Sequence, residues 1–321
     1  MIGRALKTLL LICVMGASFV GSSRAQIVTD NSGVVLRLSS VFESVFRLDA
    51  SLFSGRGTLQ GLPEFIRAGF LTPFHPLLGA LKEPELKPFE RLIESGQVDH
   101  VSVGARSFHI PMSATGDPLM GADIAFDACY VLQLGPRVRV DLKKLLAAEP
   151  TTNVRGKPIW QVPRYRGTGA SVMVFQESQN IFILTAPPLL NEVMDSLFSK
   201  VRPDNRVTDE IQHKAVWGIR TYRRGVDADK SVIGLDAIEP MITDRRAQYL
   251  VSFLDQGAGL FRLRYFTSSG DPSINTLFFR MLNFSKTTEE QWEAAIRVSD
   301  AQESAEQVLI GMALFGFGTL I

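Results

Sequence analysis

The chain has 321 residues, of which 45% are hydrophobic and 21% are charged, with 26 glycines and 16 prolines. This composition is typical of a folded globular protein and excludes a collagen-like or wholly disordered chain. The 34 lysines and arginines nearly balance the 33 aspartates and glutamates, which gives a formal net charge of +1. A chain so close to neutral has no general attraction for polyanions, so we expect no nucleic-acid partner.

Residues 1–25 have the pattern of a cleavable signal peptide. Arg4 and Lys7 precede an apolar run over 8–21, and small residues at 23 and 25 predict cleavage after Ala25. The run is short for a spanning helix, which needs about 20 residues. Cleavage leaves 296 of the 321 residues and, by removing Arg4, Lys7 and Arg24, shifts the net charge from +1 to −2. We predict an exported protein, periplasmic or extracellular, with no transmembrane span after cleavage.

Near the predicted mature N-terminus, Val34–Leu38 indicates a strand, and the spacing of Val41, Val45 and Phe46 indicates a helix after it. The segment from Leu62 to Gly96 follows, with helices interrupted by prolines such as Pro76. It contains the densest apolar stretch of the mature chain. Such a stretch is typical of helices that cover a sheet.

A second interpretation of this apolar stretch is a hydrophobic groove for a partner or an apolar ligand. Its lining residues are expected to be Phe65, Phe70, Phe74 and Leu78. An apolar-ligand carrier would need an enclosed cavity beneath this segment.

Residues 124–134 indicate a strand, which Gly135 and Pro136 end. Cys129 lies in this strand and is the single thiol after cleavage, so we expect no intramolecular disulfide and a buried, unreactive side chain. A second strand over 137–140 leads into a helix, for which Asp141 is the expected N-cap.

The second half contains an approximate internal repeat of strand, turn, strand and helix. The first copy has strands over 171–175 and 181–185 and a helix over Leu189–Phe198. The second copy has strands over 248–254 and 261–266, followed by a helix over 274–282. Five-residue turns join the strands of each pair, which suits hairpins.

The C-terminal segment is predicted to be helical. Thr287 and Glu290 have the spacing of a capping box, and Trp292, Ala295 and Ile296 continue near helical spacing.

The sequence contains no metalloprotease, phosphate-loop or nucleophile-elbow signature. His100 and His109 are nine residues apart, which places them on opposite faces of a continuous strand and disfavours a shared metal. Asp123 and Asp127 are spaced as a carboxylate pair on one side of a strand. We therefore predict no catalytic, cofactor or metal residues. A hydrolase assembled only in three dimensions from His100, His109, Asp123 and Asp127 is the alternative.

Two arginine pairs alternate with apolar residues and are candidate anion-binding residues. Arg137 and Arg139 form one pair, and Arg262 and Arg264 form the other. Guanidinium groups on one face of a sheet can bind phosphate, sulfate or carboxylate, although such a face is more commonly just solvated.

The segments Gly156–Trp160, Ser171–Leu197, Ala215–Ile219 and Tyr249–Tyr265 resemble those of uncharacterised exported bacterial proteins built from repeated strand-turn-strand-helix units. The resemblance covers about half of the mature chain and implies an exported α+β protein with no catalytic residue to transfer.

These patterns together predict an α+β fold, with antiparallel sheet built from hairpin-plus-helix units and helices packed on one face. The polar segment Lys200–Gln212 divides an N-terminal α+β domain or subdomain, 26–200, from a C-terminal one, 201–321. The predicted function is a non-enzymatic cell-envelope interaction or binding module. Its partner is an envelope protein or ligand. Its candidate binding residues are Arg137, Arg139, Arg262, Arg264, Phe70 and Phe74.

Overall fold

The computed structural model describes residues 32–42, 44–53, 70–71, 74–105, 128–163, 171–198, 205–211, 214–222, 248–255, 258–266 and 283–297. The predicted signal peptide and the predicted helix over 274–282 lie outside these ranges. So do four residues named above, Phe65, His109, Asp123 and Asp127.

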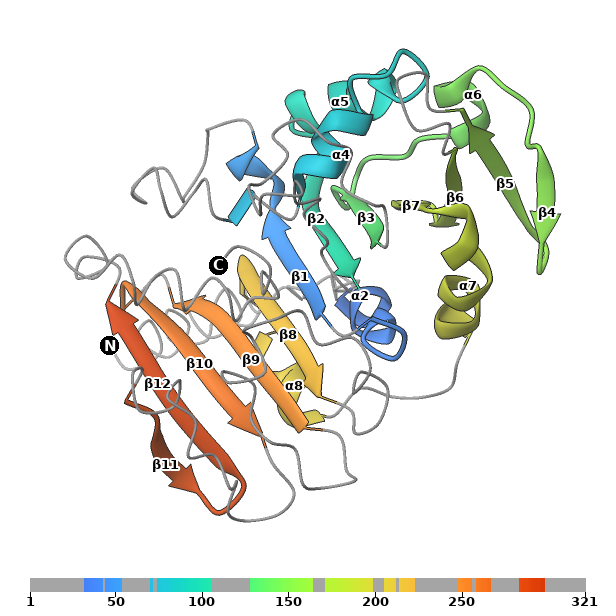
Figure 1. Cartoon of the computed structure of the whole chain (residues 1–321). Coiled ribbons are helices and arrows are strands. Elements are labelled where there is room, and N and C mark those ends of the chain that lie inside the picture. Colours follow the sequence, from blue (N-terminus) through green and yellow to red (C-terminus); the bar gives the residue numbers. More distant parts are fainter. Residues whose placement is uncertain are drawn as a thin grey trace, which may run out of the picture. The chain divides into compact units, whose positions relative to one another are not determined.

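Twelve strands form a single sheet in which every neighbouring pair is antiparallel (Figure 1). Their order across the sheet is β11-β12-β10-β9-β8-β1-β2-β3-β7-β6-β5-β4. The strands are β1 (Ser44–Asp49), β2 (Val98–Ala105), β3 (Ala128–Leu134), β4 (Thr152–Val154), β5 (Lys157–Val162), β6 (Val172–Ser178), β7 (Ile181–Thr185), β8 (Val216–Tyr222), β9 (Gln248–Asp255), β10 (Leu260–Phe266), β11 (Ser285–Thr288) and β12 (Gln291–Arg297).

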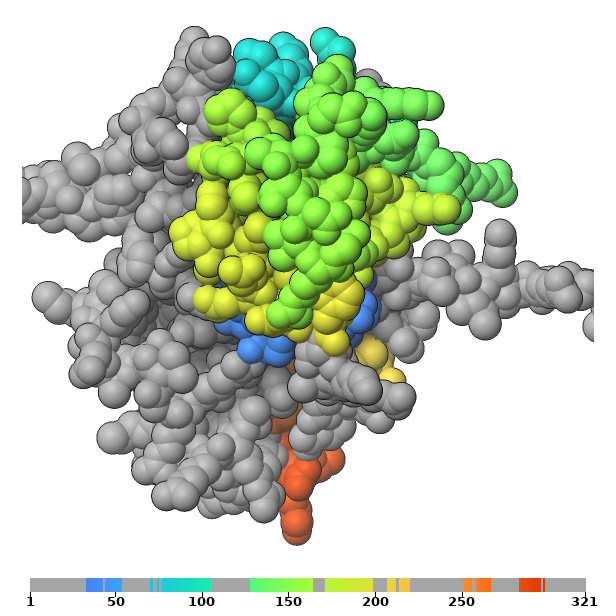
Figure 2. Space-filling model, turned by 90° about the vertical axis from the view of Figure 1, so that its right-hand side faces the viewer, coloured from blue at the N-terminus to red at the C-terminus, as the bar shows by residue number. Residues whose placement is uncertain are grey.

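The helices of the described residues are short. They are α2 (Ser32–Leu38), α4 (His75–Ala80), α5 (Lys87–Glu94), α6 (Leu142–Leu146), α7 (Leu190–Phe198), α8 (Asn205–Ile211), and the 3-10 helices η1 (Ala50–Leu52) and η3 (Pro187–Leu189). The coarse prediction of an antiparallel sheet with helices is confirmed. Space-filling Figure 2 shows segments 142–163 and 171–198, which contain α6, η3, α7 and β4–β7, as one continuous surface.

Helices pack on both faces of the sheet, which corrects the prediction that one face carries them all. One apolar cluster joins Phe46 of β1 to α4 and α5, whereas the other joins Val45, the preceding residue, to α2 and α7. Successive residues of a strand point to opposite faces. The two clusters therefore lie on opposite sides of the sheet, and central strands such as β1 are buried on both sides.

The elements near the N-terminus are the reverse of those predicted. Residues 32–38 form helix α2, and residues 44–49 form strand β1, which pairs with β2 on one side and β8 on the other. A strand buried on both faces loses the alternation that identifies strands in a sequence. The closely spaced apolar residues Val45, Phe46 and Leu48 therefore imitated a helical pattern.

Residues 283–297 contain a hairpin and not the predicted C-terminal helix. Strands β11 and β12 pair, and β12 also pairs with β10 along its whole length. The Thr287 hydroxyl, which was expected to cap a helix, instead donates from Oγ1 to the Gln291 carbonyl in the turn. Thr288 Oγ1 accepts a hydrogen bond from the Glu290 amide in the same turn. Pairing with β10 outweighs the helical spacing of Trp292.

Several local predictions are confirmed. Asp141 is the N-cap of α6 and accepts a hydrogen bond from the Lys143 amide at 3.0 Å. Strands β6 and β7 form a hairpin followed by η3 and α7, although the turn between the strands is shorter than predicted. Cys129 is fully buried in β3, and burial raises the pKa of its thiol. Pro76, in contrast, lies in the first turn of α4 and does not end a helix.

The sheet runs continuously through both predicted halves of the chain. Strand β8, which follows the polar segment 200–212, pairs with β1 from the N-terminal half. Helix α8 lies within that segment. Residues 26–200 and 201–321 therefore contribute strands to one sheet.

Candidate functional site

Arg262 and Arg264 lie side by side on β10 and are bound to carboxylates. Arg262 pairs with Asp255 at 3.0 Å and Glu293 at 2.6 Å, and Arg264 pairs with Glu293 at 3.0 Å and with Glu210 of α8. The predicted alternation is present, because Leu263 between them is buried in the opposite face. An external anion would have to compete with these carboxylates, so the arrangement ties β10 to its neighbours.

Arg137 and Arg139 are exposed, but the segment that holds them is not a strand. Arg139 donates to the carbonyls of Pro136 and Val138, while Val138 and Val140 pack against the apolar cluster below. Four strands separate β3, which precedes this segment, from β10. The structure thus does not bring the two arginine pairs together.

Phe70 and Phe74 are fully buried in an aromatic cluster. The Phe74 ring lies 5.9 Å from that of Phe46 and 5.4 Å from that of Phe53, and the Phe70 ring lies 5.4 Å from that of Phe261. This placement favours the interpretation that the apolar segment covers the sheet. Leu78, which was also predicted to line the groove, is half-buried.

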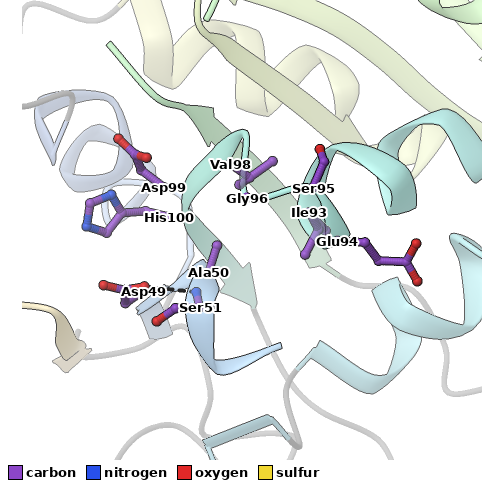
Figure 3. A pocket seen from close by; sticks show the side chains of 10 residues that line it. All are labelled: Asp49, Ala50, Ser51, Ile93, Glu94, Ser95, Gly96, Val98, Asp99 and His100. Atoms are coloured by element: carbon purple, nitrogen blue, oxygen red, sulfur yellow. Dashed lines mark hydrogen bonds between the residues drawn. The ribbon is translucent and has the colours of Figure 1, made fainter. Parts of the chain in front are cut away.

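His100 lines a cleft of about 380 Å³ at one end of β1 and β2. Residues 49–51 come from the junction of β1 and η1, residues 93–96 from the end of α5, and residues 98–100 from the start of β2. The side chains of Asp49, Asp99 and His100 gather on one side of the cleft, and Glu94 points away on the other side (Figure 3). Ala50, Ile93 and Val98 give the cleft an apolar component.

Local capping patterns build both walls of the cleft. Asp49 is the N-cap of η1 and accepts a hydrogen bond from the Ser51 amide at 2.9 Å. Helix α5 ends in a left-handed residue, Gly96, whose amide donates to the Ile93 carbonyl while the Gln97 amide donates to the Leu92 carbonyl. This pair of bonds is the usual glycine-dependent helix ending, and it turns the chain directly into β2.

A β-bulge directs Asp99 toward the cleft. Val98 is opposite Leu134 and His100 is opposite Gln133, so Asp99 is the extra residue in β2. Bulges commonly redirect side chains beside functional sites. Gly135 leaves room for this carboxylate, since a Cβ at that position would lie 3.2 Å from Asp99 Oδ1.

The environment of Asp99 disfavours its charged form. Burial raises the pKa of Asp99 above its ordinary value, the neighbouring Asp49 carboxylate raises it further, and the charge of Arg47 lowers it. Two carboxylates that repel each other in a partly buried cleft are stabilised by a positive charge between them.

Polar side chains continue from the cleft across the adjacent strands. Asp49, His100 and Gln133 occupy one cross-strand row, and Arg47 and Ser102 occupy the next row on the same face. Arg47, Ser102 and Gln133 are all buried. Buried polar groups are costly to fold, and such a concentration is characteristic of functional sites.

The sequence pattern singled out His100 but not the residues around it. Asp49 and Arg47 are in a segment that was predicted to follow a helix, and Asp99 was not among the candidate residues. One local signal could have pointed to Asp49. An aspartate that is followed two residues later by a free backbone amide, here that of Ser51, is typical of a cap where a strand ends and a helical turn begins.

Within the described residues, no group of three or more His, Cys, Asp or Glu side chains is arranged to hold a metal ion. In that same part of the chain, no helix combines the length and apolar character needed to cross a membrane.

Comparison with known proteins leaves the class of this protein open. No family model matches the chain, and no curated protein matches it. Two crystal forms of a protein designated TP0453 are similar in structure. Crystal form III has a TM-score of 0.38 and 8% sequence identity, and the match covers 86% of this chain and 97% of TP0453. Crystal form I has a TM-score of 0.39 and 9% sequence identity, and the match covers 88% of this chain and 97% of TP0453. TM-scores below 0.5 do not define a shared fold, so the function must follow from the residues of this chain.

Proposed function

We propose that this protein is an exported, non-enzymatic binding module of the cell envelope, and that the cleft beside β1 and β2 binds a lysine or arginine side chain of a partner. The observation that carries the proposal is that the Asp49 and Asp99 side chains line the same side of the cleft (Figure 3). Burial raises the pKa of Asp99, and the charge of Asp49 raises it further. A cation placed between them relieves their repulsion.

The shape and lining of the cleft support a long basic side chain in preference to a small ion. Ala50, Ile93 and Val98 provide apolar surface next to the carboxylates. Lysine and arginine bury an aliphatic stem while keeping a charged end in a polar environment. A stem along the apolar surface and a charged end at Asp49 and Asp99 satisfy both parts of the cleft.

Export rests on the N-terminal pattern, and the proposed class follows the resemblance to uncharacterised exported bacterial proteins. The mature protein then begins at Gln26 and acts in the periplasm or outside the cell. Mass spectrometry of the protein purified from its host tests this directly. A mature mass that still includes residues 1–25 contradicts it.

The repeated architecture is also part of the proposal. The hairpin β6–β7 is followed by η3 and α7, and we infer the same order after the hairpin β9–β10. In this proposal the two hairpin-plus-helix units arose by duplication and flank the central strands that carry the cleft.

Binding of Nα-acetyl-lysine methylamide to the mature chain, followed by NMR chemical shifts, tests the cleft. We expect the shifts to map to residues 49–51 and 98–100, and Asp49→Asn and Asp99→Asn each to weaken binding about tenfold, because one charge interaction is lost. Glu149→Gln is the matched control, since Glu149 is an exposed acid paired with Lys143 outside the cleft. Equal weakening in the control, or unchanged binding in both cleft variants, contradicts the proposal.

A hydrolase is the second candidate function, because His100 lies in the cleft beside two carboxylates of which one has a raised pKa. That combination suits acid–base chemistry. Hydrolysis of generic ester or glycoside substrates by the purified chain, abolished by His100→Gln, would replace the binding function. Turnover that persists in His100→Gln shows that His100 is not the catalytic residue.

A further inference from the structure

The two arginine pairs that were predicted to bind anions differ in the structure. Arg262 and Arg264 are paired with carboxylates of this chain. Arg137 and Arg139 are exposed, and within the described part of the chain neither of them forms an ion pair. Because an arginine stays protonated at any physiological pH, these two guanidinium groups are available to an anion from outside the chain.

Hydrogen bonds to the backbone hold the Arg139 guanidinium in one place. Its Nη1 atom donates to the Pro136 carbonyl at 2.8 Å and to the Val138 carbonyl at 2.9 Å. Both bonds use one nitrogen, so Nε and Nη2 keep their hydrogens along another edge of the guanidinium group. Such an edge binds a carboxylate through two parallel hydrogen bonds. An arginine that is already held in place loses little conformational freedom when the carboxylate binds.

The segment that carries these arginines begins at the edge of the cleft, although the arginines themselves do not line it. The Gly135 amide donates to the carbonyl of Gln97, which lies between two lining residues of the cleft. A Cβ at Gly135 would lie 3.2 Å from Oδ1 of Asp99, which lines the cleft. The next residue, Pro136, accepts the bond from Arg139. Standard bond lengths along this path place Arg139 Nη1 at most about 14 Å from the Asp99 carboxylate.

We propose that the cleft and these arginines together bind a peptide chain that ends in lysine or arginine. This inference rests on the proposed function, in which the basic side chain enters the cleft at Asp49 and Asp99. The free α-carboxylate of the same terminal residue binds at Arg137 and Arg139. In an extended lysine the ammonium nitrogen and the carboxylate are about 7 Å apart. A hydrogen bond of about 2.9 Å at each end extends this span to about 13 Å, so one terminal residue bridges both sets of charges.

The experiment compares two probes that differ only at the carboxyl group, Nα-acetyl-lysine and Nα-acetyl-lysine methylamide, by NMR titration of the mature chain. The free acid should bind about fivefold more tightly, because it gains an exposed ion pair with arginine. The Nε–H resonance of Arg139 should shift with the free acid and not with the methylamide. Arg137→Gln/Arg139→Gln should bind both probes with the methylamide affinity of the wild type. Arg297→Gln removes an exposed arginine outside the cleft and, as the matched control, should keep the preference.

Equal affinity of the wild type for the two probes overturns the inference and leaves the proposed function intact. This comparison needs no variant, so a folding defect cannot mask it. A preference that survives in Arg137→Gln/Arg139→Gln, or is lost equally in Arg297→Gln, also overturns the inference, because the carboxylate is then recognised elsewhere or only through the general charge. Failure of both probes to bind the wild type defeats the proposed function instead.

Discussion

Phe74→Ala tests whether the apolar segment before α5 is packed core or the lining of a ligand cavity. The Phe74 side chain is fully buried and contacts the rings of Phe46, Phe53 and Tyr130 at centroid distances of 5.9, 5.4 and 6.4 Å. Truncation of a buried phenylalanine costs about 3–5 kcal/mol of unfolding free energy. Because three ring contacts are lost together, we expect the upper part of that range.

Chemical denaturation measures the loss, and thermal melting should show a decrease of about 10 °C for a chain of this size. Phe198→Ala is the matched control, since Phe198 is 49% exposed and contacts the Arg155 guanidinium at 5.9 Å. That variant should change the unfolding free energy by about 1 kcal/mol or less. A loss below about 1 kcal/mol in Phe74→Ala, accompanied by altered binding of an apolar dye, refutes the packed core and restores the carrier hypothesis.

Two further predictions concern charged groups. Asp99→Asn should raise the melting temperature at pH 7, because the wild-type carboxyl has a raised pKa in the fold and must ionise at a cost. Protonation of Asp99 stabilises the fold fully below the pKa of the carboxyl in the unfolded chain, about 3.9, and this stabilisation is lost as the pH rises through the pKa in the folded chain. The uncharged side chain of the variant avoids that loss, so the advantage of the variant should vanish by about pH 4. An advantage that is constant with pH contradicts this cause. Glu293→Gln should lower the unfolding free energy by about 1–2 kcal/mol, since it leaves the half-buried Arg262 and Arg264 without a shared carboxylate. Glu149→Gln, which breaks an exposed pair, should leave the melting temperature unchanged, and an equal loss there would remove the special role of Glu293.

The sequence was sufficient for elements whose signals are local. Asp141 could be predicted as a cap because an N-cap needs only a short polar side chain and a free amide two residues later. The β6–β7 hairpin and α7 were predictable because alternation, turn residues and Pro187 follow each other within 28 residues, 171–198. Such signals do not depend on the rest of the fold.

The errors occurred where distant strands decide the structure. Strand β1 is buried on both faces because β2 and β8 flank it and helices cover both sides, and neither neighbour is adjacent in sequence. Strand β12 pairs with β10 from an earlier hairpin, and this pairing prevails over a capping-box pattern at Thr287. Local spacing cannot report a partner some 30 residues or more away.

The candidate cleft depends on the same long-range pairing. Asp49 and His100 are 51 positions apart in the sequence and become cross-strand neighbours only through the register of β1 with β2. Asp99 joins them because the register of β2 with β3 shifts by one residue, a feature that the sequence signals only through Gly135. The placement of Arg47, Asp49 and Asp99 in one region is therefore a property of register. A one-residue slip of β1 would move Arg47 and Asp49 to the opposite face, into the aromatic cluster, where neither charge could be accommodated. Burial of Phe46 and Leu48 against that cluster thus fixes the register that creates the cleft.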